Sequence, residues 1–243
     1  WADDFDGPAG TAPDAAKWAY DIGIGPGNDG WGNNELQYYT DRPENIALDG
    51  AGNLAITARS ESYGGRAFTS ARVNTKGIFD QAYGRFEARI KMPWGPGIWP
   101  AFWMLGANID QVPWPQCGEI DIMEHVGYDP NNVHCSIHTS AYNHTRGTQK
   151  TANTLVSGAT DDFHTYRVDW TPYAVRGFVD GTQYFEFVNE NTGFTTWPFN
   201  KNFFLILNIA VGGNWGGAQG VDNTIFPATM LVDYVRVYKM IEQ

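Results

Sequence analysis

Three carboxylates stand close together in one short segment, Gly118–His125 (GEIDIMEH). On a β-strand, alternate side chains share a face, so Glu119 and Asp121 are expected on one face and the isoleucines on the other. Strict alternation would place Glu124 among the apolar residues, where a lone carboxylate is costly. One extra residue in the strand, a β-bulge that leaves Met123 irregular, returns Glu124 to the acidic face. Adjacent carboxylates titrate in separated, coupled steps, which suits acid–base chemistry.

The same acids allow other interpretations. In a solvated edge strand, acidic and apolar residues also alternate without any catalytic role. Clustered carboxylates are also the hard oxygen ligands that calcium or magnesium prefers. A third alternative is a transition-metal site with the candidate ligands Glu124, His125, His134 and His138. Its last two histidines are four residues apart, but the pattern from Val133 to Ile137 is that of a strand, so the helical spacing of zinc motifs does not apply.

Tryptophans on both sides of the acids favour a carbohydrate ligand. Trp99 and Trp103 share one face of the strand expected in Ile98–Leu105 (IWPAFWML). Other tryptophans occupy stretches rich in glycine or proline, namely Trp31, Trp94, Trp114 and Trp215. Aromatic rings stack on the apolar C–H faces of sugars, while carboxylates and amides bind their hydroxyl groups. For Trp170 and Trp197 we prefer packing in the core.

Short strands must position these side chains, because helical signals are weak. Tyr83–Met92 alternates most clearly, with its even-numbered apolar residues on one face and charged residues on the other. Asp180-Gly181 predicts a two-residue hairpin turn. The remaining expected strands are Asn53–Arg59, Val133–Thr139, His164–Trp170, Val175–Val179, Thr182–Val188, Phe203–Val211 and Thr229–Tyr238. One helical turn is expected at Pro13–Trp18.

Many strands and few helices predict an all-β fold, an antiparallel β-sandwich or a barrel. The sequence has no internal repeat, no low-complexity run and no linker rich in proline or serine. We therefore expect a single domain over residues 1–243.

Composition and charge exclude several classes of function. Sixteen Lys and Arg stand against 27 Asp and Glu, and the resulting net charge of −11 repels phosphate, which excludes nucleic acid as a partner. No apolar run approaches the ~18–20 residues of a membrane span, so no membrane partner is expected. The sequence opens at Trp1 with neither Met nor a signal segment, from which we expect a processed, secreted protein. We also expect a monomer.

The two cysteines are predicted to be free thiols. Cys117 has the same parity as Glu119, whereas Cys135 has the opposite parity to His138 on the next expected strand. Side chains on opposite faces of a sheet point apart, and such a pair cannot be bridged without moving the backbone.

The ordered motifs of the whole chain resemble glycoside hydrolase family 16 in its bulged, laminarinase-like form. Gly118–Gly127 (GEIDIMEHVG) resembles the active-site signature of the family. Further segments match in order, namely Asp3–Gly7 (DDFDG), Gly30–Thr40 (GWGNNELQYYT), Thr69–Thr75 (TSARVNT), Tyr83–Met92 (YGRFEARIKM), Gly97–Leu105 (GIWPAFWML), His134–Thr139 (HCSIHT), Phe203–Trp215 (FFLILNIAVGGNW) and Met230–Tyr238 (MLVDYVRVY).

This resemblance implies a β-jelly roll of two stacked sheets with a concave substrate cleft. It implies endo-acting, retaining hydrolysis of β-1,3-glucosidic bonds in laminarin-like β-glucans, with mixed β-1,3-1,4-glucans as further substrates. By the same resemblance, Glu119 is the nucleophile and Glu124 the general acid/base. Asp121 tunes both glutamates, and His138 supports Asp121. The implied substrate-binding residues are Asn34, Arg72, Trp99, Trp103, Asn214 and Trp215.

The resemblance implies no cofactor for catalysis, but it suggests a structural calcium ion. The matching positions are Asp4, the carbonyl of Gly50, and Asp233, which interrupts an apolar run where an unpaired acid is costly. A surface salt bridge is the alternative for these acids.

A non-catalytic, lectin-like glucan-binding sandwich is the alternative from another class of function, because one sandwich fold hosts both activities. Glu119 and Glu124 together favour the enzyme, since a binding module needs no such pair. Among enzymes, a transglycosylase or a hydrolase of agarose or carrageenan is the alternative. Sulfated substrates call for a basic cleft, so the charge of −11 favours a neutral glucan.

Overall fold

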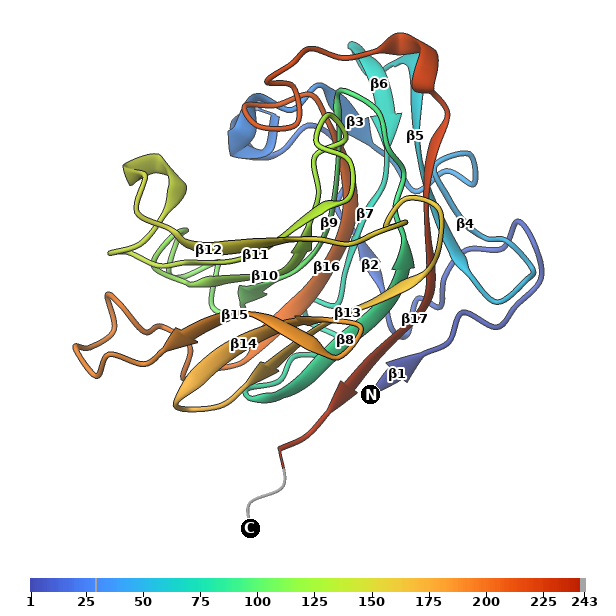
Figure 1. The fold of residues 1–243 in the computed structure, drawn as a ribbon. Helices are drawn as coiled ribbons and strands as arrows, with labels where there is room; N and C mark the ends of the chain where they lie inside the picture. The colour runs from blue at the N-terminus through green and yellow to red at the C-terminus, as the bar shows by residue number, and fades with distance from the viewer. Residues whose placement is uncertain (29, 241–243) are drawn as a thin grey trace.

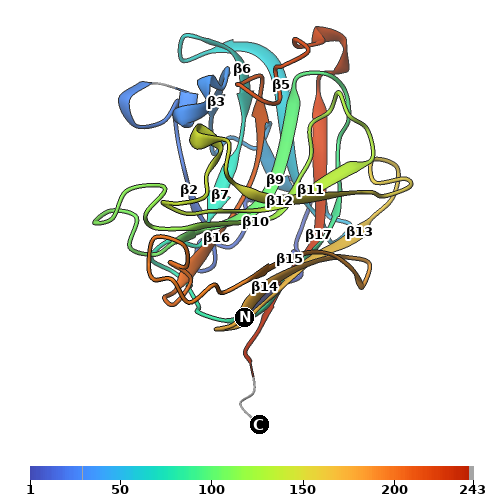
Figure 2. The same cartoon turned by 60° about the vertical axis from the view of Figure 1, so that its left-hand side comes forward.

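The structure is a computed structural model, and it describes residues 1–28 and 30–240. Two β-sheets stacked face to face form its framework (Figures 1 and 2). The described strands pair antiparallel, apart from the parallel pair β3–β6. Both sheets are open, so the sandwich alternative is confirmed over the barrel. The described helices are short turns, and none of them has the length and apolar character to cross a membrane.

The first sheet has the strand order β15-β14-β13-β8-β17-β5-β6-β3, with β1 paired to β17 and β4 paired to β5. Its strands are β1 (Ala2–Asp3), β3 (Gln37–Tyr39), β4 (Ile46–Leu48), β5 (Leu54–Tyr63), β6 (Arg66–Ser70), β8 (Gly84–Lys91), β13 (His164–Trp170), β14 (Ala174–Val179), β15 (Thr182–Val188) and β17 (Ala228–Tyr238).

The second sheet has the order β12-β11-β10-β9-β16-β7-β2. Its strands are β2 (Ala19–Tyr20), β7 (Arg72–Asn74), β9 (Ile98–Gly106), β10 (Glu119–Glu124), β11 (Asn132–His138), β12 (Lys150–Leu155) and β16 (Phe203–Val211). Short helical turns lie in the loops at η1 (Pro26–Asn28), η2 (Gly30–Asn34), η3 (His144–Arg146) and η4 (Asn223–Ile225).

The core lies between the sheets and follows the alternation of the sequence. On β8, the residues at positions 86, 88 and 90 are fully buried and the charged residues between them are not. Trp170 and Trp197 are buried as expected. In the predicted hairpin, Asp180 and Gly181 both have positive φ, 48° and 82°, which matches the turn that suits the twist of paired strands.

Strand β16 is buried along its whole length because both of its faces are covered. One face contributes Leu205 and Leu207 to the core between the sheets. The other contributes Phe204 and Ile206 to a smaller apolar cluster on the opposite side of the second sheet. Cys117 lies in this smaller cluster and Cys135 in the main core, and both are free thiols as predicted.

The β-bulge predicted in β10 is present. Against β9, Asp121 pairs with Trp103 and Met123 pairs with Phe102, so Ile122 has no partner there. The irregular residue on this side is therefore Ile122 and not Met123, which was expected from the sequence. Both side chains are fully buried in the core, because two adjacent residues of the bulge can point to the same face.

The first and last strands of the chain are neighbours in the first sheet. β1 pairs with β17, with Ala2 opposite Arg236, and the Trp1 carbonyl accepts a hydrogen bond of 2.8 Å from the Val237 N–H. Nearby, Asp14 starts the expected single turn by accepting hydrogen bonds from the backbone N–H groups of Lys17 and Trp18.

Candidate active site

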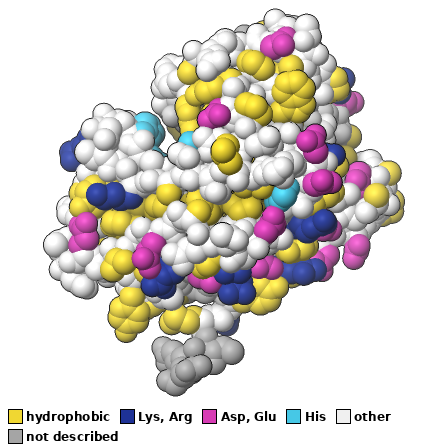
Figure 3. Space-filling view, in the orientation of Figure 1, with side chains coloured by type: hydrophobic (Ala, Val, Ile, Leu, Met, Phe, Trp, Pro, Cys, Tyr) yellow, Lys and Arg dark blue, Asp and Glu magenta, His cyan; other side chains and the backbone are white. Residues whose placement is uncertain are grey.

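The three acids of β10 lie on the face of the second sheet that points away from the core between the sheets. Glu119 pairs with His138 of β11, Asp121 with Trp103 of β9, and Glu124 with His134 of β11. The bulge brings Glu124 back to the face of the other two acids, as predicted. In the space-filling view, the molecule is hollowed between η3 and the η1–η2 segment, and histidine side chains are visible there (Figure 3). We call this hollow the cleft.

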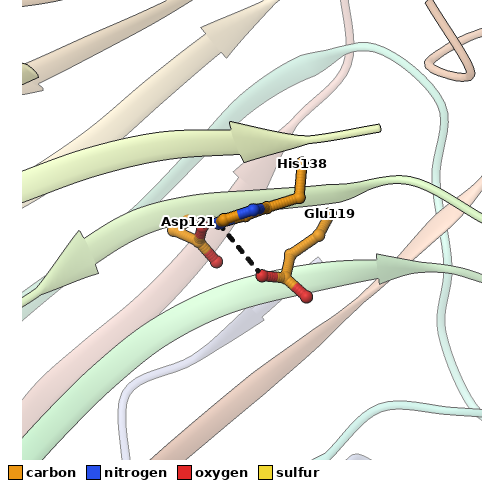
Figure 4. Close-up of side chains that lie close together, drawn as sticks. All are labelled: Glu119, Asp121 and His138. Carbon is orange, nitrogen blue, oxygen red and sulfur yellow. Dashed lines mark ion pairs between the residues drawn. The ribbon is translucent and has the colours of Figure 1, made fainter. Parts of the chain in front are cut away.

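Glu119, Asp121 and His138 form the tightest group in the site (Figure 4). His138 Nε2 lies 3.3 Å from Asp121 Oδ2 and 3.6 Å from Glu119 Oε1. Asp121 is 2% exposed, and its Oδ2 has no hydrogen-bond partner among the described residues. His138 therefore stands beside both acids, and its supporting role stays a prediction.

Glu124 is held by the tryptophan expected to line the cleft. The indole N–H of Trp99 donates a hydrogen bond of 3.0 Å to Glu124 Oε1. Trp99 packs edge to face with Trp215 at 5.4 Å between ring centroids, and Trp215 does the same with His134 at 4.9 Å. These contacts restrict the orientation of Glu124, as general acid/base catalysis requires.

Burial changes the proton affinity of all three acids. Loss of solvent raises the pKa of Glu119 to about 8, and the charge of Asp121 adds to this effect while His138 opposes it. Burial and Asp121 likewise raise the pKa of Glu124 to about 8. The pKa of Asp121 is raised to about 8 by burial, against a hydrogen bond with Glu119. The group therefore holds protons near neutral pH, and one glutamate can act as an acid while its neighbour is ionised.

A second set of polar side chains lies on the other side of Trp103. The indole N–H of Trp103 donates to Asn208 Oδ1 (2.8 Å), and Asn208 Nδ2 donates to the Tyr39 hydroxyl (3.0 Å). The Tyr39 hydroxyl in turn donates to the buried carboxylate of Glu35 (3.2 Å). Glu35 also accepts hydrogen bonds from Gln37 (2.6 Å) and Asn33 (3.3 Å). We call Glu35, Tyr39, Asn208 and Trp103 the Glu35 chain.

Arg72 and the η2 loop complete this side of the cleft. The Arg72 guanidinium lies between the rings of Trp31 and Trp103, at 4.5 and 4.8 Å from their centroids, and pairs with Asp21 at 2.8 Å. Asn34 Nδ2 donates to Asn214 Oδ1 at 2.8 Å, which connects the η2 loop to the loop after β16. The charge of Arg72 is thus balanced by Asp21, and its guanidinium is stacked on two aromatic rings.

The structure brings together the predicted catalytic and cleft residues through this network of contacts. Several residues of this network were not predicted from the sequence, namely Glu35, Tyr39, Asn208, Asp21 and His144. His144 of η3 packs against Trp114, and both rings lie near His138. Asn208 had a detectable signal, because it is the one amide in the otherwise apolar stretch Phe203–Val211 (FFLILNIAV).

The potential metal ligands that lie together in the structure are not the set predicted from the sequence. His125 is fully buried and its Nδ1 contacts the carbonyl oxygen of Asn132 at 2.9 Å, so it does not join His138 at the acids. Among residues 1–28 and 30–240, the group of three potential ligands that lie together is Glu119, Asp121 and His138.

The acids of the predicted calcium site both have arginine partners. Asp4 Oδ1 pairs with Arg236 at 2.8 Å, and Asp233 Oδ2 pairs with Arg89 at 2.6 Å. Gly50 has φ of 79°, and a Cβ there would lie 2.9 Å from the Ala9 backbone nitrogen. Calcium at Asp4, Gly50 and Asp233 stays a prediction, and a guanidinium beside each acid favours the salt-bridge alternative. An unchanged melting temperature with calcium or with EDTA would support that alternative.

Comparisons with known proteins agree with the fold. The model of glycosyl hydrolases family 16 matches residues 31–236. A beta-glucanase of Rhodothermus marinus is 50% identical over 249 residues, covering 100% of this chain and 85% of the relative. The X-ray structure of the laminarinase from Rhodothermus marinus superposes with a TM-score of 0.94 at 51% identity, covering 100% of this chain and 97% of that one.

A third similar structure is SCLam, a non-specific endo-β-1,3(4)-glucanase, with a TM-score of 0.91 and 47% identity over 98% of this chain and 89% of that one. The jelly-roll fold, together with the full-length similarity to a beta-glucanase and to a laminarinase, shows that the chain is a glycoside hydrolase. The chain belongs to glycoside hydrolase family 16.

Proposed function

We propose that this enzyme is an endo-β-1,3-glucanase of the laminarinase type. It cleaves internal β-1,3-glucosidic bonds of laminarin-like β-glucans, and mixed β-1,3-1,4-glucans are further substrates. The observation that carries the proposal is the pair Glu119 and Glu124, which the bulge places on one face of β10 with Asp121 between them. The similar beta-glucanase and laminarinase support the choice of glucan.

We assign the chemistry to retaining catalysis. Burial raises the pKa of both glutamates, so the pair holds a proton near neutral pH, and Glu124 donates this proton to the glycosidic oxygen as the bond to the leaving sugar breaks. The ionised carboxylate of Glu119 attacks the anomeric carbon and forms a covalent glycosyl-enzyme. Glu124 then takes a proton from a water molecule whose oxygen attacks the anomeric carbon, the bond to Glu119 breaks, and the sugar leaves with its original configuration. Asp121 and His138 lie beside Glu119 and set how the protons are shared.

The walls of the site suit a neutral polysaccharide. Trp99, Trp103 and Trp215 offer aromatic surface and Asn34 and Asn214 offer amides, which together match the apolar faces and hydroxyls of glucose units. Arg72 is neutralised by Asp21 and so offers no free charge to a sulfate group. Because laminarin-like substrates are large polymers, we also propose that the enzyme acts outside the cell.

Digestion of purified polysaccharides tests this proposal. Laminarin, lichenan and agarose are incubated with the enzyme, and new reducing ends and product sizes are measured. We expect rapid shortening of laminarin, slower cleavage of lichenan and none of agarose. Laminarin that binds to the protein but stays intact would instead establish the lectin-like alternative.

A further inference from the structure

The geometry at the acids also suits a metal ion that the hydrolytic reaction does not use. Glu119, Asp121 and His138 each offer one ligand atom, and these atoms lie within 4.8 Å of one another. One nitrogen and two carboxylate oxygens form a mixed ligand set of the kind that zinc binds in proteins. All three side chains come from the paired strands β10 and β11, on which Glu119 and His138 are direct neighbours.

The spacing from His138 to each of the two acids matches that around a tetrahedral ion. Zinc bonds to nitrogen and oxygen at about 2.0–2.2 Å, so two ligands of a tetrahedral site lie about 3.3–3.6 Å apart. The two nitrogen–oxygen separations here are 3.3 and 3.6 Å. Both separations from His138 Nε2 therefore match those in a zinc site, and the ligand oxygens of the two acids lie within 4.8 Å of each other.

The hydrogen bonding of the group points to the same conclusion. Asp121 Oδ2 is deeply buried and directed toward His138 Nε2, yet it has no hydrogen-bond partner among the described residues. A buried carboxylate oxygen without a donor is unfavourable, and a cation would satisfy it. The side chains of Glu119, Asp121 and His138 are only 14%, 3% and 8% exposed, so their positions are restricted by packing.

We propose that Zn²⁺ binds reversibly to Glu119, Asp121 and His138, with water as the fourth ligand, and inhibits the enzyme. The ion forms bonds to Glu119 Oε1, Asp121 Oδ2 and His138 Nε2 and displaces any proton that these atoms carry. Bound in this way, Glu119 can no longer attack a sugar. The inhibition rests on the proposed role of Glu119 as nucleophile, whereas the binding itself does not.

Calorimetric titration with Zn²⁺ alone and absorption spectra with Co²⁺ test the site without reference to activity. We expect one Zn²⁺ per chain and the intense visible bands that Co²⁺ gives in a tetrahedral site. Asp121→Asn and His138→Asn should each weaken binding at least about tenfold and remove these bands. Far-ultraviolet circular dichroism of each variant verifies that it is folded.

His164→Asn is the matched control. His164 Nδ1 lies 2.6 Å from Asp180 Oδ2, so this pair offers a histidine and a carboxylate without a second acid. Zinc binding should be unchanged in this variant. Equal zinc affinity in the wild type, Asp121→Asn and His138→Asn would overturn the proposed site, as would an octahedral cobalt spectrum.

Steady-state hydrolysis of laminarin then separates the two parts of the proposal. We expect zinc to inhibit at the concentrations that saturate the calorimetric site and laminarin to compete with it. Binding without inhibition would refute the inhibitory role and question Glu119 as nucleophile, while the metal site itself would stand.

Discussion

Asp121 and Glu35 are both buried carboxylates, at 2% and 5% exposure, but their surroundings differ. Glu35 accepts hydrogen bonds from the side chains of Gln37, Tyr39 and Asn33. Asp121 lies among other acids, and its Oδ2 has no hydrogen bond from any residue that the structure describes. Burial raises the pKa of both groups, but only for Glu35 do several side-chain donors and the charge of Arg72 oppose this rise.

This difference separates an acid that stabilises the fold, Glu35, from an acid of the active site, Asp121. A buried carboxylate with several donors is stabilised as part of the scaffold, and its hydrogen bonds fix the groups around it. A buried carboxylate with few donors keeps an elevated proton affinity, which is typical of active sites. Hydrogen-bond satisfaction therefore distinguishes the two acids better than burial does.

The largest expected effect comes from removal of either catalytic glutamate. Glu119→Ala and Glu124→Ala should each lower kcat on laminarin by at least about 10³-fold, since each removes a group that acts on the reacting atoms. With an activated aryl glycoside, azide should accelerate Glu124→Ala and yield the β-glycosyl azide. Glu119→Ala should yield the α-azide by direct attack. Nuclear magnetic resonance of the products identifies the anomer, and the same anomer from both variants would contradict the roles.

Removal of the structural acid should act on stability first. Glu35→Ala leaves the donors of Gln37 and Tyr39 without their acceptor in a buried site, at a cost of about 2–4 kcal/mol. In a domain of this size, each 1 kcal/mol lowers the melting temperature by about 2–4 °C. Differential scanning calorimetry measures the change. A normal melting temperature would mean that Glu35 does not stabilise the scaffold.

Asp121→Asn should instead stabilise the protein, and more so as the pH rises. The native pKa of Asp121 is raised to about 8, whereas an unfolded Asp titrates near ~4. Between these values the native state binds more protons than the unfolded state, so the free energy of unfolding falls as the pH rises. The variant lacks this loss, and its melting temperature should exceed that of the wild type by several degrees at pH ~8 and by little at pH ~4.

The same variant should keep partial activity with a shifted pH profile, because Asp121 tunes the glutamates and does not attack the sugar. Melting curves and pH–rate profiles from one preparation test both statements. A melting temperature that falls equally at all pH values would place Asp121 with Glu35 as a structural acid.

The smallest effect is expected where the Glu35 chain is broken at a single hydroxyl. Tyr39→Phe keeps the ring but removes the link between Glu35 and Asn208, which leaves Trp103 less restricted. We expect a loss of about 1–2 kcal/mol in stability and a rise in KM of a few fold, with kcat nearly unchanged. Tyr38→Phe on the same strand is the control and should change neither. A fall in kcat alone would contradict a role in substrate positioning.

Local patterns predicted most of the fold. Alternation on β8, the Asp180-Gly181 turn and the strand bounds of β13, β15 and β16 followed from residue types and period alone. The bulge in β10 followed from one energetic argument, the cost of burying Glu124. That argument could not decide between Ile122 and Met123, because the outcome depends on the pairing with Phe102.

The hydrogen bonds of the Glu35 chain could not be predicted from local patterns. Tyr39 and Asn208 are 169 positions apart, and only the packing of β16 beside the loop segments brings them together. The acids share one strand and were predictable, whereas the scaffold side of the cleft is assembled from distant segments and was not. Resemblance to the family supplied Arg72, Asn34 and Asn214 without explaining what holds them.

The pairing of β1 with β17 also bears on how this enzyme can be joined to other proteins. Figure 1 shows the N-terminus beside β17, on the side of the molecule away from the η1–η2 segment. A protein domain fused at Trp1 would therefore not block the binding of a polysaccharide in the cleft. A circular permutant with a short peptide from the end of β17 to Trp1 and new ends at the exposed Asp180-Gly181 turn would keep every strand intact.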